Sequence, residues 1–183
     1  EGVTTGSYNT MVGVSSGRKM TSGNSNAALG VNSLESNTTG VYNTAIGMSA
    51  LTTNVNGGNN TAVGFESLKA SVNGDNTGLG YLSLKLNTAI GNTAVGAYSG
   101  DSNIGGANIT AIGNRALCSN TTGNNGTAVG LCSLRSNTTG GCNTAVGVCS
   151  MFANTTGANN AAVGEAALDS NTEGNSNVAM GRN

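Results

Sequence analysis

Residues 143–147 read NTAVG, and the same five letters stand at 60–64 and 92–96, with the variant NTAIG at 43–47 and 87–91. The glycines that close strings of this type are separated by 17 residues, except for two consecutive steps of 16. They are Gly13, Gly30, Gly47, Gly64, Gly80, Gly96, Gly113, Gly130, Gly147, Gly164 and Gly181. Residues 1–183 therefore form one tandem array with a period of 17 residues.

The idealised repeat is N-T-A-V-G-x-x-S-L-x-x-N-T-T-G-x-x, and its residues are numbered below as positions one to seventeen. Position four is always apolar, position nine is nearly always Leu, position three is small except for Met11, and position eight is Ser or Ala. Two helices do not fit into 17 residues, and Asn, Thr and Gly are poor helix formers. Two short strands and two turns fit well. One repeat cannot bury its two large apolar side chains alone, whereas stacked repeats can.

The repeat predicts an all-β, single-domain parallel β-solenoid, or β-roll, that covers residues 1–183 without separate caps. It would have about eleven coils that rise about 4.8 Å each. The two 16-residue steps fall between Gly64 and Gly96. Each must shorten a turn, because loss of a residue from a strand would reverse its inward and outward faces. We place one loss just before Asn76 and the other within 86–92.

We expect positions four and nine to point into the solenoid and the often charged position ten to point outward. The unbroken apolar file at position four would then be the core: Val12, Leu29, Ile46, Val63, Leu79, Val95, Ile112, Val129, Val146 and Val163. Position two, mostly Thr, would share the inward face with position four, because alternate residues of a strand lie on one side.

Asn recurs at positions one and twelve. Aligned between stacked coils, these amides would form ladders of hydrogen bonds along the rod. The alternative is that the Asn residues only form turns, since Asn tolerates positive φ.

The string NTAVGxxSLxxNTTG resembles the head repeats of trimeric autotransporter adhesins, which carry related S-V-A-I-G strings. It also resembles repeats in tail-fibre and surface-fibre proteins of phages and large viruses. The resemblance covers the whole chain and implies a left-handed β-roll, trimeric assembly and a cell-surface, virion-surface or other extracellular location. It also implies that the position-three alanines are points of close approach: Ala45, Ala62, Ala94, Ala111, Ala128, Ala145 and Ala162.

The composition excludes several functions. The chain has no His, 8% charged residues and a net charge of −1. It therefore offers no histidine chemistry, and its charge favours neither nucleic acid nor an anionic membrane as a partner. No apolar run approaches the roughly 18 residues of a membrane span. No close pair of carboxylates or phosphate-binding loop is present, so we expect no enzyme, and no catalytic, cofactor-binding or metal-binding residue.

Cysteines and glycosylation sequences provide the remaining candidate sites. Cys132 and Cys149 both stand at position seven of adjacent repeats. Stacking would bring their Cα atoms to about 4.8 Å, within the disulfide range, so a disulfide and two free thiols both stay open. Cys118 and Cys142 have no evident partner. Seven N-x-[ST] sequences at positions twelve and seventeen are expected to face outward and to accept glycans: Asn37, Asn59, Asn108, Asn120, Asn125, Asn137 and Asn154.

These observations favour a structural subunit of an extracellular or virion-surface fibre. The repeat pattern runs unbroken from Glu1 to Asn183. Either the chain is a fragment of a longer array, or copies stack head to tail, with the coil of Gly181 pairing against the segment of Gly6. The alternative function is an adhesin-type rod, trimeric and binding carbohydrate or another surface. An ice-binding solenoid with a file of Thr at position two is a further alternative.

Overall fold

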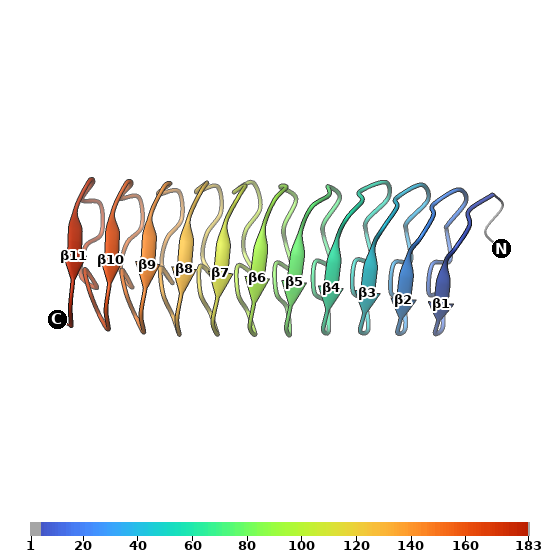
Figure 1. The fold of residues 1–183 in the computed structure, drawn as a ribbon, viewed down its shortest axis with the longest axis horizontal. Helices are drawn as coiled ribbons and strands as arrows, with labels where there is room; N and C mark the ends of the chain where they lie inside the picture. Colours follow the sequence, from blue (N-terminus) through green and yellow to red (C-terminus); the bar gives the residue numbers. More distant parts are fainter. Residues whose placement is uncertain (1–4, 183) are drawn as a thin grey trace.

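The computed structural model describes residues 5–182 and confirms the parallel β-solenoid (Figure 1). Eleven strands, one per coil, lie side by side in sequence order in a single parallel sheet, and residues 5–182 contain no helix. The strands are β1 Thr10–Val12, β2 Ala27–Leu29, β3 Thr44–Ile46, β4 Thr61–Val63, β5 Thr77–Leu79, β6 Thr93–Val95, β7 Thr110–Ile112, β8 Thr127–Val129, β9 Thr144–Val146, β10 Ala161–Val163 and β11 Val178–Met180. Residues 1–4 and 183, from which the two ends of the expected array were counted, lie outside the described residues.

The strand register is kept through the two short repeats, as predicted. Thr61 pairs with Thr77, and Thr77 pairs with Thr93. In a full coil the Asn43 amide donates to the position-fifteen carbonyl of Gly57. The carbonyls of Asn73 and Ala89 take the same role in the short coils. Both coils have therefore lost position fourteen, in the NTTG turn.

The second NTAIG string, at 87–91, does not form a strand. Its Asn87 stands at position twelve, Gly91 has φ +71°, and Ile90 is half exposed. The same letters at 43–47 contain β3. The same five residues therefore form a strand at one place in the repeat and a turn at another, because pairing with the neighbouring coils outweighs their intrinsic strand propensity.

The structure confirms that position nine lies in the core. Its Leu and Met side chains are fully buried: Leu34, Leu51, Leu68, Leu84, Leu117, Leu134 and Met151. Position ten points outward as expected: Arg18 is exposed, and Lys69 and Arg135 are partly exposed.

The predicted core file at position four is wrong. Every one of its residues is exposed or partly exposed: Val12, Leu29, Ile46, Val63, Leu79, Val95, Ile112, Val129, Val146 and Val163. The exposed fraction is 53% for Val12 and 50% for Leu29. Position two faces outward with it, and the small residue at position three points inward instead.

The narrow interior explains this orientation. At position three of β5, a Cβ atom added to Gly78 would lie 2.7 Å from the Ser67 hydroxyl and 3.1 Å from Leu68 Cγ. The Ser133 hydroxyl, at position eight, donates to the position-three carbonyl of Ala145 at 3.0 Å. Where position nine carries Leu or Met, only Ala or Gly fits between walls this close, so Val or Ile must face outward. The alanines therefore approach the opposite wall of their own chain.

Two coils with Gly at position nine fill the vacant volume from another position. In the first, a Cβ on Gly17 would lie 2.7 Å from Met11 Sδ. In the other, a Cβ on Gly100 would lie 3.6 Å from Ile109 Cδ1, and Ile109 is 1% exposed. The sequence thus conserves core volume rather than residue type.

The asparagine ladders are present at both positions. At position one, Asn60 Nδ2 donates to Asn43 Oδ1 at 3.0 Å. At position twelve, Asn137 Nδ2 donates to Asn120 Oδ1 at 2.8 Å. Among the described residues no buried side-chain nitrogen or oxygen lacks a partner. The buried amides therefore bind coil to coil, beyond any role in shaping turns.

Gly126 interrupts the position-one ladder, and replacing it should strengthen the rod. In regular coils the amide oxygen of one Asn accepts the next backbone N–H, as Asn143 Oδ1 does from Asn160 N at 2.9 Å. We expect Gly126→Asn to supply this acceptor to Asn143 and to stabilise the fold by about 1 kcal/mol. Chemical denaturation against Gly126→Ala isolates the hydrogen bond from the loss of glycine's freedom. Equal stability of the two variants would contradict the prediction.

Candidate functional site

The outward side of the sheet carries the most regular surface of the molecule. We call it the threonine–valine face and define it as positions two and four of β1–β11. Position two contributes Thr10, Ala27, Thr44, Thr61, Thr77, Thr93, Thr110, Thr127, Thr144, Ala161 and Val178. Position four contributes the ten residues named above and Met180. Neither position carries a charged residue in any of the eleven strands, which leaves the face uncharged along the rod.

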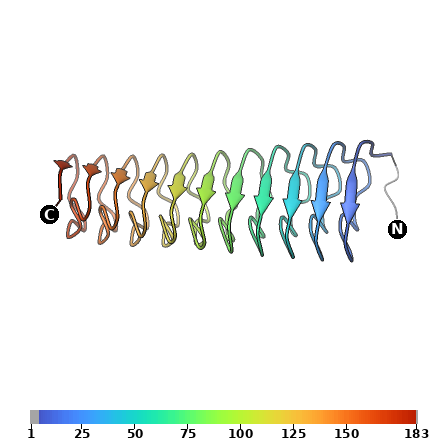
Figure 2. The same ribbon diagram turned by 60° about the horizontal axis from the view of Figure 1, so that its bottom comes forward.

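Apolar side chains at position six widen the exposed surface. Val31, Met48, Leu131 and Val148 are all close to half exposed. With strands about 4.8 Å apart and residues about 3.3 Å apart along a strand, the eleven-stranded surface covers on the order of 600 Å² in projection. An uncharged surface of this size with exposed apolar side chains on every coil is suited to an interaction site. Figures 1 and 2 show the strand direction turning gradually from β1 to β11, so the face twists along the rod.

Three of the four ion pairs among residues 5–182 join side chains at positions seven and ten. Glu66 accepts hydrogen bonds from Lys69 at 2.6 Å and pairs with Lys85 at 3.1 Å. The hydrogen bond from Lys69 is the main reason that the pKa of Glu66 is lowered, and it outweighs partial burial. These partly exposed pairs gather charge outside positions two and four, and the threonine–valine face itself carries none.

All four cysteines are free thiols, so the structure does not contain the candidate Cys132–Cys149 disulfide. Parallel stacking explains why: equivalent Cβ atoms are held at about the coil spacing of 4.8 Å, beyond the usual disulfide range of about 3.5–4.5 Å. Burial raises the pKa of the Cys149 thiol, and the neighbouring Cys132 adds to the shift. Cys149 is therefore held in the protonated form at neutral pH.

Four of the seven glycosylation sequences are buried, contrary to expectation. The buried asparagines all stand at position twelve: Asn37, Asn120, Asn137 and Asn154. Their amides bind within the ladder, as Asn154 Nδ2 does to Asn137 Oδ1 at 2.8 Å. The three at position seventeen, Asn59, Asn108 and Asn125, are exposed. Glycans at these three stay a prediction.

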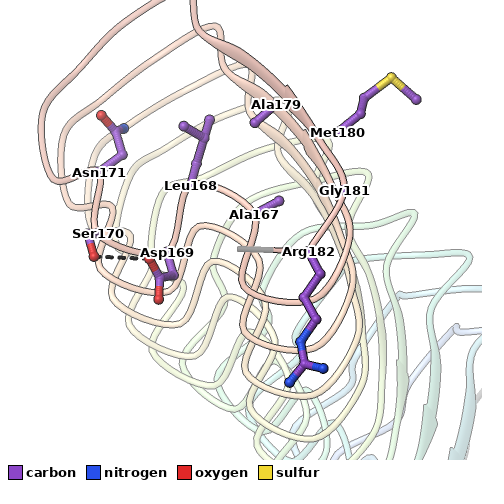
Figure 3. Close-up of a pocket in the computed structure, with 9 residues that line it drawn as sticks. All are labelled: Ala167, Leu168, Asp169, Ser170, Asn171, Ala179, Met180, Gly181 and Arg182. Atoms are coloured by element: carbon purple, nitrogen blue, oxygen red, sulfur yellow. Dashed lines mark hydrogen bonds between the residues drawn. The ribbon is translucent and has the colours of Figure 1, made fainter.

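A hollow of about 480 Å³ lies at the C-terminal coil between residues 167–171 and 179–182 (Figure 3). Leu168 and Ala179 point toward its interior, and the Ser170 hydroxyl donates to Asp169 at 3.0 Å at its rim. Leu168 is partly exposed, whereas the equivalent Leu134 is fully buried under a following coil. The hollow is thus lined by core side chains that no later coil covers within residues 5–182.

No protein-family model, curated protein or solved structure matches this chain. The resemblance to adhesin heads and fibre repeats therefore stays a prediction. Within residues 5–182 no helix could cross a membrane, and no three His, Cys, Asp or Glu side chains gather as metal ligands would.

Proposed function

We propose that this protein is a structural subunit of an extracellular or virion-surface fibre and that its main partner is another copy of itself. The threonine–valine face carries the proposal. It exposes apolar side chains on every coil, and charge is absent from positions two and four of all eleven strands. Its area is of the same order as the roughly 800 Å² that each partner contributes to a stable interface. The extracellular or virion-surface location rests on the sequence resemblance.

The twist of the face supports a copy of the chain as its partner. A second rod has the same coil spacing and the same twist, so two rods that wind around each other can keep their valine files in contact along the full length. A flat partner would lose contact toward the ends. Two or three copies can bury the face in this way, and the resemblance to adhesin heads favours three.

End-to-end stacking is the second part of the proposal. In β1–β10 the position-two N–H donates to the following coil, as Ala161 N does to the carbonyl of Asn177 at 2.9 Å. The equivalent N–H of Val178 points away from β10 and can donate to the first coil of another copy. Backbone pairing and the asparagine ladders would then continue across the junction.

The lateral contact is tested by placing charge on the face. We expect Val95→Lys combined with Val129→Lys to convert the assembly to monomers, because like charges would oppose across the interface. Sedimentation velocity measures the mass, and circular dichroism checks the fold. Thr139→Lys with Thr156→Lys adds the same charge at exposed turn residues and should leave assembly unchanged. A face variant that assembles like the control would overturn lateral association.

End-to-end stacking is tested in the same preparation by electron microscopy. Val178→Pro removes the outward N–H without removing a bond to β10, so fibres should shorten or disappear while lateral assembly persists. Val178→Ala is the control. Fibres of unchanged length in the proline variant would show that the ends do not join copies.

Ice binding is a second candidate, since the threonines of β3–β9 prove to face outward in a regular file. A thermal-hysteresis assay decides it. The twist of the face opposes binding to a flat crystal plane, so we expect no hysteresis. Clear hysteresis that is lost in the Val95→Lys, Val129→Lys variant would favour ice binding over the fibre.

A further inference from the structure

A second surface lies outside the threonine–valine face, on the coils of β6–β8. It is a hollow of about 240 Å³ between side chains at positions seven, ten and eleven. Its polar lining comprises Tyr98, Asp101, Ser102, Arg115, Ser119 and Arg135. Because it uses neither position two nor position four, it can be occupied whether or not copies associate through the face.

Two unneutralised guanidinium groups distinguish this hollow. Among the described residues, Arg18 pairs with Glu35 and Arg182 pairs with Glu165. Arg115 and Arg135, the other two arginines, have no carboxylate within ion-pairing distance in residues 5–182. They are thus the arginines whose charge remains available to a ligand.

Aromatic rings hold both guanidinium groups in place. Arg115 Cζ lies 5.5 Å from the centroid of the Tyr98 ring, and Arg135 Cζ lies 5.4 Å from that of Phe152. A cation–π contact attracts the guanidinium charge to the ring without using an N–H donor, so the donors stay available. Those donors match the paired oxygens of a carboxylate or sulfate. The hollow therefore presents two guanidinium groups to one class of anion.

The rest of the lining fits a hydroxyl-rich ligand. The hydroxyls of Ser102 and Ser119 both donate and accept, and the Asp101 carboxylate accepts. Partial burial raises the pKa of Asp101, opposed by hydrogen bonds from Ser102. A row of rings leads away from the hollow: Tyr98 meets Tyr81 edge-on at 5.3 Å, and Tyr81 stacks on Phe65 at 5.4 Å. Tyr81 is 46% exposed, so its ring offers an apolar platform to a second sugar unit.

From this arrangement we propose that the hollow binds an acidic saccharide. Its carboxylate or sulfate lies against Arg115 and Arg135, and its hydroxyls bond to Asp101, Ser102 and Ser119. The fibre would then carry a defined attachment point on one segment of an otherwise repetitive rod. The proposal does not depend on assembly, since a monomer presents the same hollow.

Isothermal titration calorimetry on the full chain tests it with four probes of similar length. A sulfated heparin hexasaccharide and a galacturonate hexamer supply the two anionic groups. Maltohexaose is the neutral sugar, and hexaglutamate is an anion without sugar. We expect at least one acidic saccharide to bind and maltohexaose and hexaglutamate to bind at least about tenfold more weakly, as the loss of charged or sugar contacts implies.

Matched arginine variants locate the binding. Arg115→Gln with Arg135→Gln should weaken acidic-saccharide binding by at least about tenfold, while Arg18→Gln, a change to a paired arginine elsewhere on the rod, should not alter it. Circular dichroism confirms that each variant is folded. The proposal is overturned if neither acidic saccharide binds, if the double variant binds like the wild type, if Arg18→Gln is equally damaging, or if hexaglutamate binds as well as the saccharides.

Discussion

Gly130→Ala is expected to abolish the regular stack at β8. Gly130 stands at position five with φ +134°, a conformation that side-chain-bearing residues rarely adopt. A Cβ atom there would lie 2.6 Å from the carbonyl carbon of Gly147 and closer still to its oxygen. The atoms that the added Cβ would meet belong to the backbone of the next coil, which cannot move aside as a side chain could. We expect a loss of more than about 4 kcal/mol of stability, or failure to fold, because strain and clash act together.

Gly126→Ala is the matched control for this change. It lies four residues earlier in the same coil, has no positive φ, and its added Cβ would lie 3.6 Å from the nearest atom, on Leu117. The control should therefore keep or slightly gain stability. Urea denaturation followed by circular dichroism measures both variants. If Gly130→Ala unfolded at the same urea concentration as Gly126→Ala, the close contact of position five with the next coil would not exist in solution.

The sequence predicts those features of the fold that repeat from one coil to the next along the rod. A fixed period requires that position one lie on position one of the next coil, so the ladder through Asn43 and Asn60 follows from spacing alone. The same logic places the two deletions in turns, because a deletion in β5 or β6 would have shifted the register of Thr77 and Thr93.

The sequence does not predict as easily which side of the strand faces inward. Alternate residues of each strand do lie on the same side. However, an unbroken apolar file such as Val95, Ile112 and Val129 is equally compatible with the core of a solenoid and with the interface of an assembly. The width of the interior decides which side of the strand faces inward. That width depends on Ser133 and Leu134, which lie on the opposite wall. The small residue at position three was the available signal. Apolar character at position four then indicates a surface that associates.

The candidate site residues also depend on the direction of side chains, which repeat spacing does not give. Cα spacing leaves both a Cys132–Cys149 disulfide and two free thiols open, whereas a disulfide depends on the distance between Cβ atoms, which parallel stacking keeps too long. The sequence predicts Asn120 and Asn137 both as members of a ladder and as outward glycosylation sites; the ladder forms, and it holds their amides inside. The hollow of Arg115 and Arg135 combines irregular positions from three coils, so no single repeat contains it.

Leu134→Asp should be the most damaging single substitution among the side chains of the core. Leu134 is 0% exposed, and the two neighbouring coils place Leu117 and Met151, also buried, at the same position. A carboxylate there would have no cation and no water, and the lost packing adds to the cost. We expect destabilisation of at least about 4 kcal/mol, or an unfolded chain. The φ of +49° at this position is one that Asp tolerates better than Leu, so backbone strain cannot cause the loss.

Val129→Asp places the same carboxylate five residues away, at position four of β8, where the side chain is partly exposed. The charge there remains hydrated in a monomer, so folding should lose no more than about 1 kcal/mol. The same variant should weaken association, because it puts charge on the threonine–valine face. Denaturation and sedimentation of the two variants therefore separate core from interface. If Val129→Asp unfolded the chain while Leu134→Asp did not, the inward and outward faces would be reversed. If Val129→Asp were harmless to both folding and association, the fold would stand but the lateral interface would not.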